Sequence, residues 1–313
     1  MILVTGAAGH VGHVVVRQLV EAGHHVRALV RRRAKADERL GNIEKVEILE
    51  ADVTDMSALR RALEGVAAVV HTVAIAIERA PGTYALVNTE GTRNALAAAD
   101  QAGVSRFIHI SQLGCAPDLP FPFLRSKGLA EQAVRESELA WTIMRPSAIF
   151  GPTDEFANVL ARLIRLSPFV FPIPGNGKAR FQPVYVGDVA TCVVRALAND
   201  TTIGGRYEIG GPEVLTYDEI VDLVLRALGT RRLKIHLPLA VMRPLVIAMQ
   251  TVLPNPPVTA SLLDLLTVEN TTTDRALEEL FSVQPTPFIP QNLRYMREFS
   301  AGEALRRLLD TSK

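Results

Sequence analysis

The sequence has few cysteines, few aromatic residues and almost no net charge. Its 313 residues include only Cys115 and Cys192, far apart and outside any Cys/His cluster, which excludes a disulfide scaffold and a cysteine-type zinc site. Lys and Arg number 34 against 33 Asp and Glu, so the formal net charge is +1 and a dedicated nucleic-acid-binding protein is not expected. Aromatic residues make up 5%, too few for a base-stacking platform.

Long apolar runs are also missing. The nearest approach, 237–253, is interrupted by Pro238, Arg243, Pro244 and Gln250, and it falls short of the ~18 uninterrupted apolar residues of a membrane span. The N-terminus shows no basic segment and no cleavage site, so no targeting segment is expected. We therefore expect a reduced, cytoplasmic chain, with a peripheral position at the inner membrane as the alternative.

The first half of the chain alternates apolar runs with helical patterns. The runs predict strands at 2–4, 26–30, 46–49, 67–70, 107–110 and 141–144. Helical spacing appears between them, at 11–22, 56–63, 84–102 and 126–137. This alternation predicts an α/β fold, with a doubly wound parallel (Rossmann) sheet covered by helices on both faces.

After about residue 150 the pattern changes, and prolines become frequent. At ~150 residues per domain, the length allows two domains. A helical pattern at 188–197 and a short strand at 206–209 still resemble the first half. We predict a dinucleotide-binding domain formed by 1–150 with a return through 184–210. A second, smaller, mostly helical domain for a substrate or partner is then formed by 151–183 and 211–313.

The strongest local signal is a glycine-rich turn. Gly6, Gly9 and Gly12 have the spacing GxxGxxG between the first predicted strand and the first predicted helix. The first glycine permits the tight turn, the second lets the backbone approach a pyrophosphate, and the third lets the helix pack close to the strand. The helix N-terminus offers free N–H groups and a partial positive charge to phosphates. The turn therefore predicts dinucleotide binding.

The choice of cofactor depends on the end of the second strand. An NAD site usually has Asp or Glu there for the ribose 2′-OH. Here the residue is Val30, and Arg31 and two further arginines follow it. A guanidinium suits a 2′-phosphate, so the sequence favours NADP(H), with Arg31 as its contact and NAD(H) as the alternative. Asp52 and Val53, after the third strand, are placed to flank the adenine.

Several motifs carry a family resemblance. They are the loop at 5–12, Asp52, the NTEGTRN stretch at 88–94, Ser111, 145–152 and 184–190. Over about 1–220 the chain resembles the extended or atypical short-chain dehydrogenase/reductases of the NAD-dependent epimerase/dehydratase superfamily. The stretches 108–111, 125–127, 141–143, 180–186 and 210–213 are similar to the NADPH-binding accessory subunit of respiratory complex I and its free-standing bacterial relatives.

The resemblance implies a site, and the chain departs from it at one position. Active family members use a Tyr-x-x-x-Lys pair for acid–base work and a Ser for the substrate oxygen. Ser111 and Lys127 are present, but Phe123 occupies the Tyr position and has no titratable proton. The resemblance also assigns cofactor contacts to Ala8, His10, Val11, Gly12, Val73, Lys127 and Pro146. It implies no metal.

Three functions remain open at this point. The first is an NADP(H)-binding protein with weak or no standard dehydrogenase activity, acting as a structural, assembly or sensing component. The second is an NADPH-dependent reductase of a quinone, enone or aromatic substrate that uses Lys127. The third is a nucleotide-sugar epimerase or dehydratase, whose carbonyl chemistry depends most on the missing Tyr. The stretch 235–253 is expected to be an amphipathic helix covering the second domain; alternatively it meets a membrane, a quinone or a partner subunit.

Overall fold

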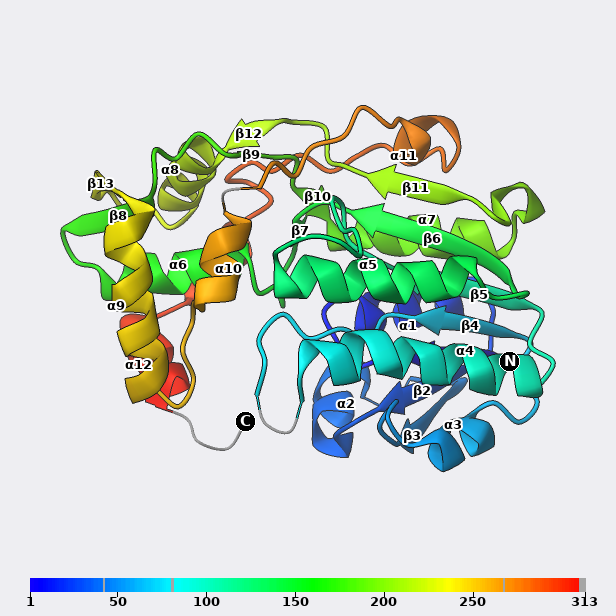
Figure 1. Cartoon of the computed structure of the whole chain (residues 1–313). Helices are drawn as coiled ribbons and strands as arrows, with labels where there is room; N and C mark the ends of the chain where they lie inside the picture. The colour runs from blue at the N-terminus through cyan, green and yellow to red at the C-terminus, as the bar shows by residue number, and fades with distance from the viewer. Residues whose placement is uncertain (42, 80–81, 267, 310–313) are drawn as a thin grey trace. The chain divides into compact units, whose positions relative to one another are not determined.

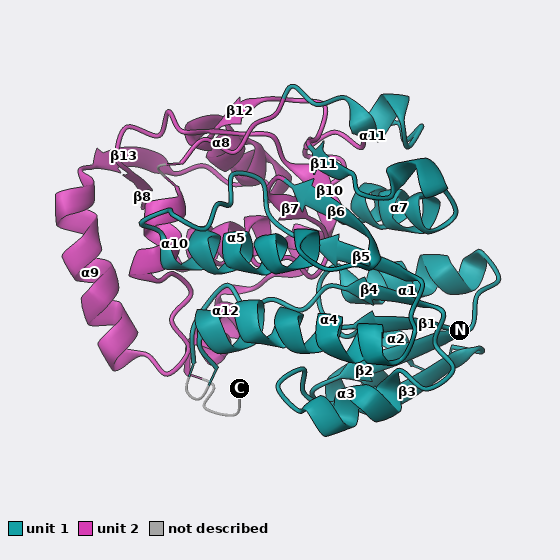
Figure 2. Cartoon of the chain, turned by 45° about the vertical axis from the view of Figure 1, so that its right-hand side comes forward, with its two compact units in different colours: residues 1–146, 186–209, 273–284 teal, residues 147–185, 210–272, 285–313 magenta. Residues whose placement is uncertain are grey.

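The computed structural model describes residues 1–41, 43–79, 82–266 and 268–309. The chain divides into two compact units, drawn in two colours in Figure 2. Unit 1 comprises Met1–Pro146, Val186–Ile209 and Thr273–Gln284, and unit 2 comprises Ser147–Tyr185, Gly210–Thr272 and Pro285–Lys313.

Unit 1 consists of a seven-stranded sheet and its helices. Its strands are β1 (Ile2–Thr5), β2 (Val26–Val30), β3 (Val46–Glu50), β4 (Ala68–His71), β5 (Arg106–Ile110), β6 (Ala140–Pro146) and β11 (Arg206–Ile209). Its helices are α1 (Gly12–Glu21), α2 (Arg33–Leu40), α3 (Met56–Ala62), the π-helix η1 (Ala85–Glu90), α4 (Gly91–Gln101), α5 (Pro122–Arg135), α7 (Val186–Leu197), the short 3₁₀-helix η2 (Asp200–Thr202) and α11 (Ala276–Glu279).

The sheet has the order β11-β6-β5-β4-β1-β2-β3, and every pair in it is parallel. The predicted Rossmann sheet is therefore confirmed. From β1 the chain adds β2 and β3 on one side of the sheet. It then crosses to the other side of β1 and adds β4, β5, β6 and β11, so the direction of winding reverses between β1 and β4. In open α/β sheets, ligands bind outside the carboxyl ends of the strands at such a reversal.

Helices cover both faces of this sheet. Helix α1 packs beside α7, and α3, α4 and α5 form a second layer, of which α4 and α5 lie toward the viewer in Figure 1. Beneath that second layer, the strands contribute Leu3, Leu29, Val69, Phe107 and Ile143 to one buried cluster. The inner strands β1, β4 and β5 are buried along their whole length and read in the sequence largely as apolar runs, whereas the edge strands β3 and β11 are only partly buried.

The segment Thr273–Gln284 belongs to unit 1, although the sequence grouped it with 211–313. Helix α11 packs against β11, and the ring of Phe281 lies edge-on to Tyr207 at 5.4 Å between centroids. Phe281 is buried, and its backbone carbonyl accepts a hydrogen bond from Arg195 of α7. One buried aromatic side chain thus ties this segment to the edge of the main sheet.

Unit 2 combines helices with three small sheets. Its helices are α6 (Ala157–Leu166), α8 (Tyr217–Ala227), α9 (Leu239–Val252), α10 (Ala260–Leu265), the 3₁₀-helix η3 (Arg294–Glu298) and α12 (Ala301–Leu309). Its two-stranded sheets pair β7 (Ile149–Phe150) with β10 (Val184–Tyr185), β9 (Arg180–Phe181) with β12 (Leu215–Thr216), and β8 (Val170–Pro174) with β13 (Leu233–Leu237). A separate core of α6, α8 and aromatic side chains, including Phe150, Phe181 and Phe288, holds the unit together.

The stretch 235–253, expected to be a single helix, is divided at Pro238. Residues before it form β13, which pairs in parallel with β8, and α9 begins at Leu239. The division follows from Pro238, because a residue that precedes proline is disfavoured in the α-helical region. Within the described ranges, no helix has both the length and the apolar character needed to cross a membrane.

Candidate functional site

The glycine loop joins β1 to α1 with the geometry that its spacing predicts. Gly6 has φ +70°, a region that favours glycine, and the N–H of Gly9 donates to the Gly6 carbonyl at 2.7 Å. A Cβ on Gly12 would lie 2.2 Å from the same carbonyl oxygen. There is therefore no room for a side chain at Gly12, and the start of α1 packs directly against the backbone that follows β1, as the third glycine of the motif requires.

Gly12→Ala is expected to destabilise unit 1 by ~1–3 kcal/mol, the usual cost of overpacking. The added Cβ would lie 2.2 Å from Gly6 O and 2.9 Å from the Ala7 Cα, and both are backbone atoms with little freedom to move. Chemical denaturation with the linear extrapolation method measures the change. Gly302→Ala in α12 is the matched control, because its Cβ meets nothing within 4 Å. Equal unfolding free energies for the two variants would contradict the tight loop.

Two side chains from helices hold the loop in place. The guanidinium of Arg39 in α2 donates to the Ala8 carbonyl at 2.9 Å, and the Nδ1 of His13 lies 2.8 Å from the Gly9 carbonyl oxygen. Burial, followed by the charges of His13 and Arg39, lowers the pKa of His10 to about 3. His10 is therefore neutral at pH 7 and does not supply a positive charge for a phosphate.

A pocket of about 200 Å³ lies at the carboxyl ends of β1, β2, β3 and β4. Seven residues assigned to the cofactor from the sequence line it: Gly6, Ala8, Gly9, Arg31, Asp52, Val53 and Val73. Its other lining residues are Leu29, Val30, Arg32, Lys35, Ala51, Thr72, Ala74, Ile75 and Val87. Of the remaining predicted contacts, Val11 and Gly12 lie at the start of α1, while His10, Lys127 and Pro146 are outside this lining.

The charged residues of this pocket are mostly basic. Arg31, Arg32 and Lys35 line it together with one acid, Asp52, whose Oδ1 accepts hydrogen bonds from the N–H and hydroxyl of Thr54. The third arginine of the run, Arg33, is not in the lining; its guanidinium donates to Asp37 and to the backbone of β3. The sequence singled out Arg31, which lines the pocket; the turn into α2 also brings Arg32 and Lys35 to it and directs Arg33 away.

A row of buried polar side chains crosses the sheet beside the pocket. Thr5, His71 and His109 occupy paired positions on β1, β4 and β5. The Nδ1 of His71 lies 2.8 Å from the Thr5 hydroxyl and its Nε2 lies 3.1 Å from the Thr92 hydroxyl, while the two histidine rings stack at 5.6 Å. Burial lowers the pKa of His71 to about 3, so the row is uncharged at neutral pH. It is a packed element of the sheet.

Lys127 lies on α5, fully buried, with its Nζ donating to the Ile110 carbonyl at 2.6 Å. Burial lowers the pKa of this ammonium to about 8, while the nearby Cys115 and Glu131 act in the opposite direction. Lys127 is thus a cation at pH 7 that can release its proton near neutral pH. Its contact with Ile110 places the group at the carboxyl end of β5, one strand beyond β4.

Phe123, in the position of the family tyrosine, is packed against another aromatic ring. Its ring lies edge-on to Tyr84 at 5.7 Å between centroids, and it is buried. The hydroxyl of Tyr84 donates to the Ala76 carbonyl at 2.8 Å. Tyr84 therefore lies close to Phe123, which occupies the position of the family tyrosine, although it comes from a different element. Its hydroxyl is engaged in the hydrogen bond to the Ala76 carbonyl.

The π-helix η1 connects the pocket to α5. The side-chain amide of Asn88 contacts the backbone N–H and carbonyl of Ile75 at 2.8 and 3.2 Å and donates to the Ser126 hydroxyl at 3.0 Å. The Thr89 hydroxyl donates to the Ser126 carbonyl. Helices of this type occur frequently at functional sites, because the wider turn redirects side chains. The sequence pattern predicted one continuous helix over 84–102 and could not indicate this widened turn.

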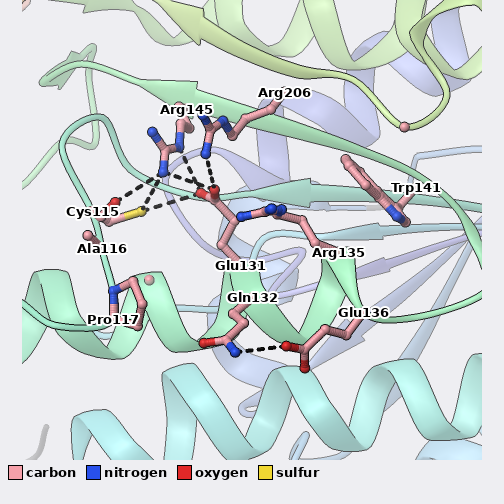
Figure 3. A pocket seen from close by; sticks show the side chains of 12 residues that line it. Cys115, Ala116, Pro117, Glu131, Gln132, Arg135, Glu136, Trp141, Arg145 and Arg206 are labelled. Atoms are coloured by element: carbon pink, nitrogen blue, oxygen red, sulfur yellow. Dashed lines mark hydrogen bonds and ion pairs between the residues drawn. The ribbon is translucent and has the colours of Figure 1, made fainter.

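Ser111 lies at the end of β5, where its hydroxyl donates to Glu131 at 2.8 Å and lies 3.2 Å from the Cys115 sulfur. Arg145 makes two hydrogen bonds to the Glu131 carboxylate, at 2.8 and 2.9 Å, and Arg206 reaches it at 3.4 Å. Figure 3 shows both guanidinium groups directed at this carboxylate. Sequence reasoning did not find this buried network, because its members come from β5, α5, β6 and β11.

The same network borders a second cavity, of about 720 Å³, whose lining includes Cys115, Glu131, Arg135, Trp141 and Arg206 (Figure 3). Burial raises the pKa of the Cys115 thiol, and the charge of Glu131 adds to that effect. The thiol is therefore protonated and unreactive at neutral pH. Among the residues that the structure describes, no group of three or more His, Cys, Asp and Glu side chains is placed to hold a metal ion.

Comparison with known proteins gives a consistent result. A family model described as NAD(P)H-binding matches residues 6–200. The chain is 31% identical over 246 residues to the mitochondrial NADH dehydrogenase (ubiquinone) 1 alpha subcomplex subunit 9 of Arabidopsis thaliana, covering 76% of this chain and 60% of that protein. It spans 60–64% of the length of the first three such relatives.

A second relative is the NAD(P)H azoreductase of Xenophilus azovorans, at 31% identity over 73% of this chain and 74% of the azoreductase. Among solved structures, the dTDP-glucose 4,6-dehydratase DesIV of Streptomyces venezuelae, with NAD and TYD bound, superposes with a TM-score of 0.71 at 21% identity. It covers 95% of this chain and 97% of DesIV. At this identity the likeness concerns the fold.

Proposed function

The chain belongs to the NAD(P)H-binding family, and from this premise we propose that it binds NADP(H) without the tyrosine-dependent acid–base chemistry of the standard dehydrogenases. The resemblance to atypical short-chain dehydrogenase/reductases is confirmed by the family match and by the related proteins. In this proposal the protein acts as a structural, assembly or sensing component that holds the cofactor.

The residues of unit 1 fit a dinucleotide. Gly6, Ala8 and Gly9 of the glycine loop line the pocket, and the partial positive charge at the N-terminus of α1 would favour the pyrophosphate. Arg31, Arg32 and Lys35 provide positive charge for a 2′-phosphate, and Asp52 with Val53 would flank the adenine. When bound, the cofactor supplies a hydride; the chain's own residues supply binding and orientation.

The single observation that carries the proposal is the pairing of Phe123 with Lys127. Phe123 has no proton to exchange, and its ring is packed against Tyr84. The cation that would support a tyrosine is instead engaged with the Ile110 carbonyl. Cofactor binding needs only the cation, whereas carbonyl reduction needs a proton donor as well. The site therefore supports binding better than standard turnover.

Arg31→Gln is expected to weaken NADPH binding about tenfold and to leave NADH binding nearly unchanged, because only NADPH has the 2′-phosphate. A charge-assisted hydrogen bond contributes ~1.5–3 kcal/mol, and Arg32 and Lys35 remain in the pocket, so the lower end applies. Isothermal calorimetry with both cofactors measures the change. Arg33→Gln is the matched control, since its guanidinium is directed at Asp37 and β3. Equal losses for NADPH and NADH, or tighter NADH binding by the parent, would refute the preference.

A second candidate function is an NADPH-dependent reductase in which Lys127 is the proton donor. Two observations favour it: the relative named NAD(P)H azoreductase, and the lowering of the Lys127 pKa to about 8. A general acid is most effective when its pKa lies near the working pH. A quinone, an enone or an aromatic substrate is then the acceptor. NADPH oxidation in the presence of each acceptor class tests this candidate directly.

The relatives named as complex I subunits suggest a partner as well as a cofactor. We include a partner subunit in the proposal, in which the NADP(H)-binding unit serves as one component of a larger assembly. Purification of the chain from its native membranes and cytosol, followed by size-exclusion chromatography, tests this part. Elution only at the mass of the 34.1 kDa chain from both fractions would refute it.

A further inference from the structure

Helix α9 exposes an apolar face. Its residues Val241, Pro244, Leu245, Ala248 and Val252, which share one side of the helix by their spacing, are all exposed; Leu245 is 61% and Val252 78% accessible. Val246 is the one buried residue of the helix. A surface helix of a globular protein normally turns its apolar stripe toward the core. The outward side of α9 is therefore built for contact with something apolar outside unit 2.

Helix α12 extends this feature. The side chain of Asn255, just beyond the end of α9, donates to the Arg307 carbonyl at 3.1 Å and so places the last turn of α12 beside that end. Leu305 and Leu309 lie one turn apart on α12 and are 51% and 57% accessible. We call the exposed apolar residues of both helices, together with the arginines of α12, the α9–α12 surface.

The charges around this surface have one predominant sign. Between 231 and 263 the sequence contains four Lys and Arg residues and no Asp or Glu, but Arg243 is paired with Asp264 and Lys234 with Asp218 and Asp222, so the cations of α12 supply most of the unpaired positive charge. In α12, Arg306 and Arg307 are exposed and take part in no ion pair among the described residues, while Glu303 is the one acid of this helix. An apolar helix face bordered by cations is the pattern that binds the interface of an anionic bilayer.

The length of α9 determines how it could meet a bilayer. Its 14 residues extend for about 21 Å, less than the ~30 Å of the hydrocarbon core, so the helix can lie in the interface but cannot cross it. A second copy of the chain would bring the same basic segments together, which disfavours self-association through this face. We propose that the α9–α12 surface docks unit 2 on the surface of an anionic lipid bilayer.

The test is flotation of the purified full chain with vesicles of phosphatidylcholine alone and of phosphatidylcholine with phosphatidylglycerol. Binding is expected to the anionic vesicles and to fall with added salt. Leu245→Glu combined with Val252→Glu should reduce that binding by at least about tenfold, because both carboxylates would have to leave water. Arg306→Gln and Arg307→Gln should each reduce it about fivefold.

Val214→Glu is the matched control, because Val214 is 49% accessible and lies in unit 2 outside this surface; its binding should equal that of the parent. Unchanged circular dichroism and NADPH affinity verify that each variant is folded. Light scattering measures the mass of every variant. The proposal is overturned if the parent does not bind anionic vesicles. It is also overturned if the parent is a dimer that Leu245→Glu dissociates, because the α9–α12 surface would then be an interface between two copies of the chain. Cofactor binding by unit 1 is a separate property, so either proposal can fail alone.

Discussion

Arg145→Met is expected to lower the free energy of unfolding by ~3–5 kcal/mol, the usual cost of removing one partner from a buried ion pair. Glu131 is 4% and Arg145 12% accessible in their side chains, and they are joined at 2.8 Å. Without Arg145, the carboxylate would retain the hydroxyl of Ser111, the thiol of Cys115 at 3.4 Å and the more distant, half-exposed Arg206. Desolvation of an incompletely compensated charge is therefore the dominant cost.

Chemical denaturation of the parent and the variant measures this difference. Arg180→Met is the matched control. Arg180 forms an ion pair with Glu269, the two side chains are 54% and 57% accessible, and exposed pairs of this kind contribute ~0–1 kcal/mol to stability. Adding Glu131→Leu to Arg145→Met should recover most of the lost stability, since an apolar pair of similar volume replaces the charges. If both single variants lose the same stability, the network of Figure 3 is not the strong interaction inferred from its burial.

Lys127→Met is expected to weaken NADPH binding roughly ten- to hundredfold, as for the loss of a charge-assisted hydrogen bond, without a fall in stability. Lys127 is buried, and burial holds its pKa near 8, so its charge already opposes folding at neutral pH. Methionine has a similar volume and no charge to desolvate, so the unfolding free energy should be unchanged or higher. Cofactor fluorescence titration beside a denaturation curve separates the two effects.

The same variant distinguishes the two candidate functions. If the protein only binds the cofactor, NADPH oxidation with quinones and enones stays at background in both parent and variant. If Lys127 is the proton donor, turnover by the parent is measurable and the variant loses ~10²–10⁴-fold in rate, far more than in affinity. In that case the parent's rate should also fall as pH rises through about 8, because only protonated Lys127 donates a proton. Lys178→Met, at an exposed position, should change nothing.

Much of unit 1 could be predicted because its signals are local. The predicted strand at 26–30 coincides with β2, and that at 206–209 coincides with β11. The inner strands are short, largely apolar runs, whereas the edge strands β3 and β11 contain charged residues and are only partly buried. In unit 2 the signals were weaker, since β7, β9, β10 and β12 have two residues each, too few for a periodicity.

The pocket was partly predictable for the same reason. Gly6, Gly9 and Asp52 follow strand ends directly, so a parallel sheet brings them to one edge. Arg39 lies within the basic run but reaches the Ala8 carbonyl only because of the angle at which α2 returns to the loop. The hydrogen bond from Arg39 to the glycine loop therefore could not be predicted from the spacing of residues along the chain.

The alternation of strands and helices, the glycine loop and Phe123 in place of the family tyrosine can all be read from short stretches of the sequence. The contacts between distant segments required the folded structure. It pairs His71 with Thr5, 66 positions away, and it joins Ser111, Glu131 and Arg145 from three elements. It also leaves the apolar side of α9 exposed. Contacts and exposure of this kind depend on which distant segments pack against a residue, and that information resides in the fold as a whole rather than in any local stretch.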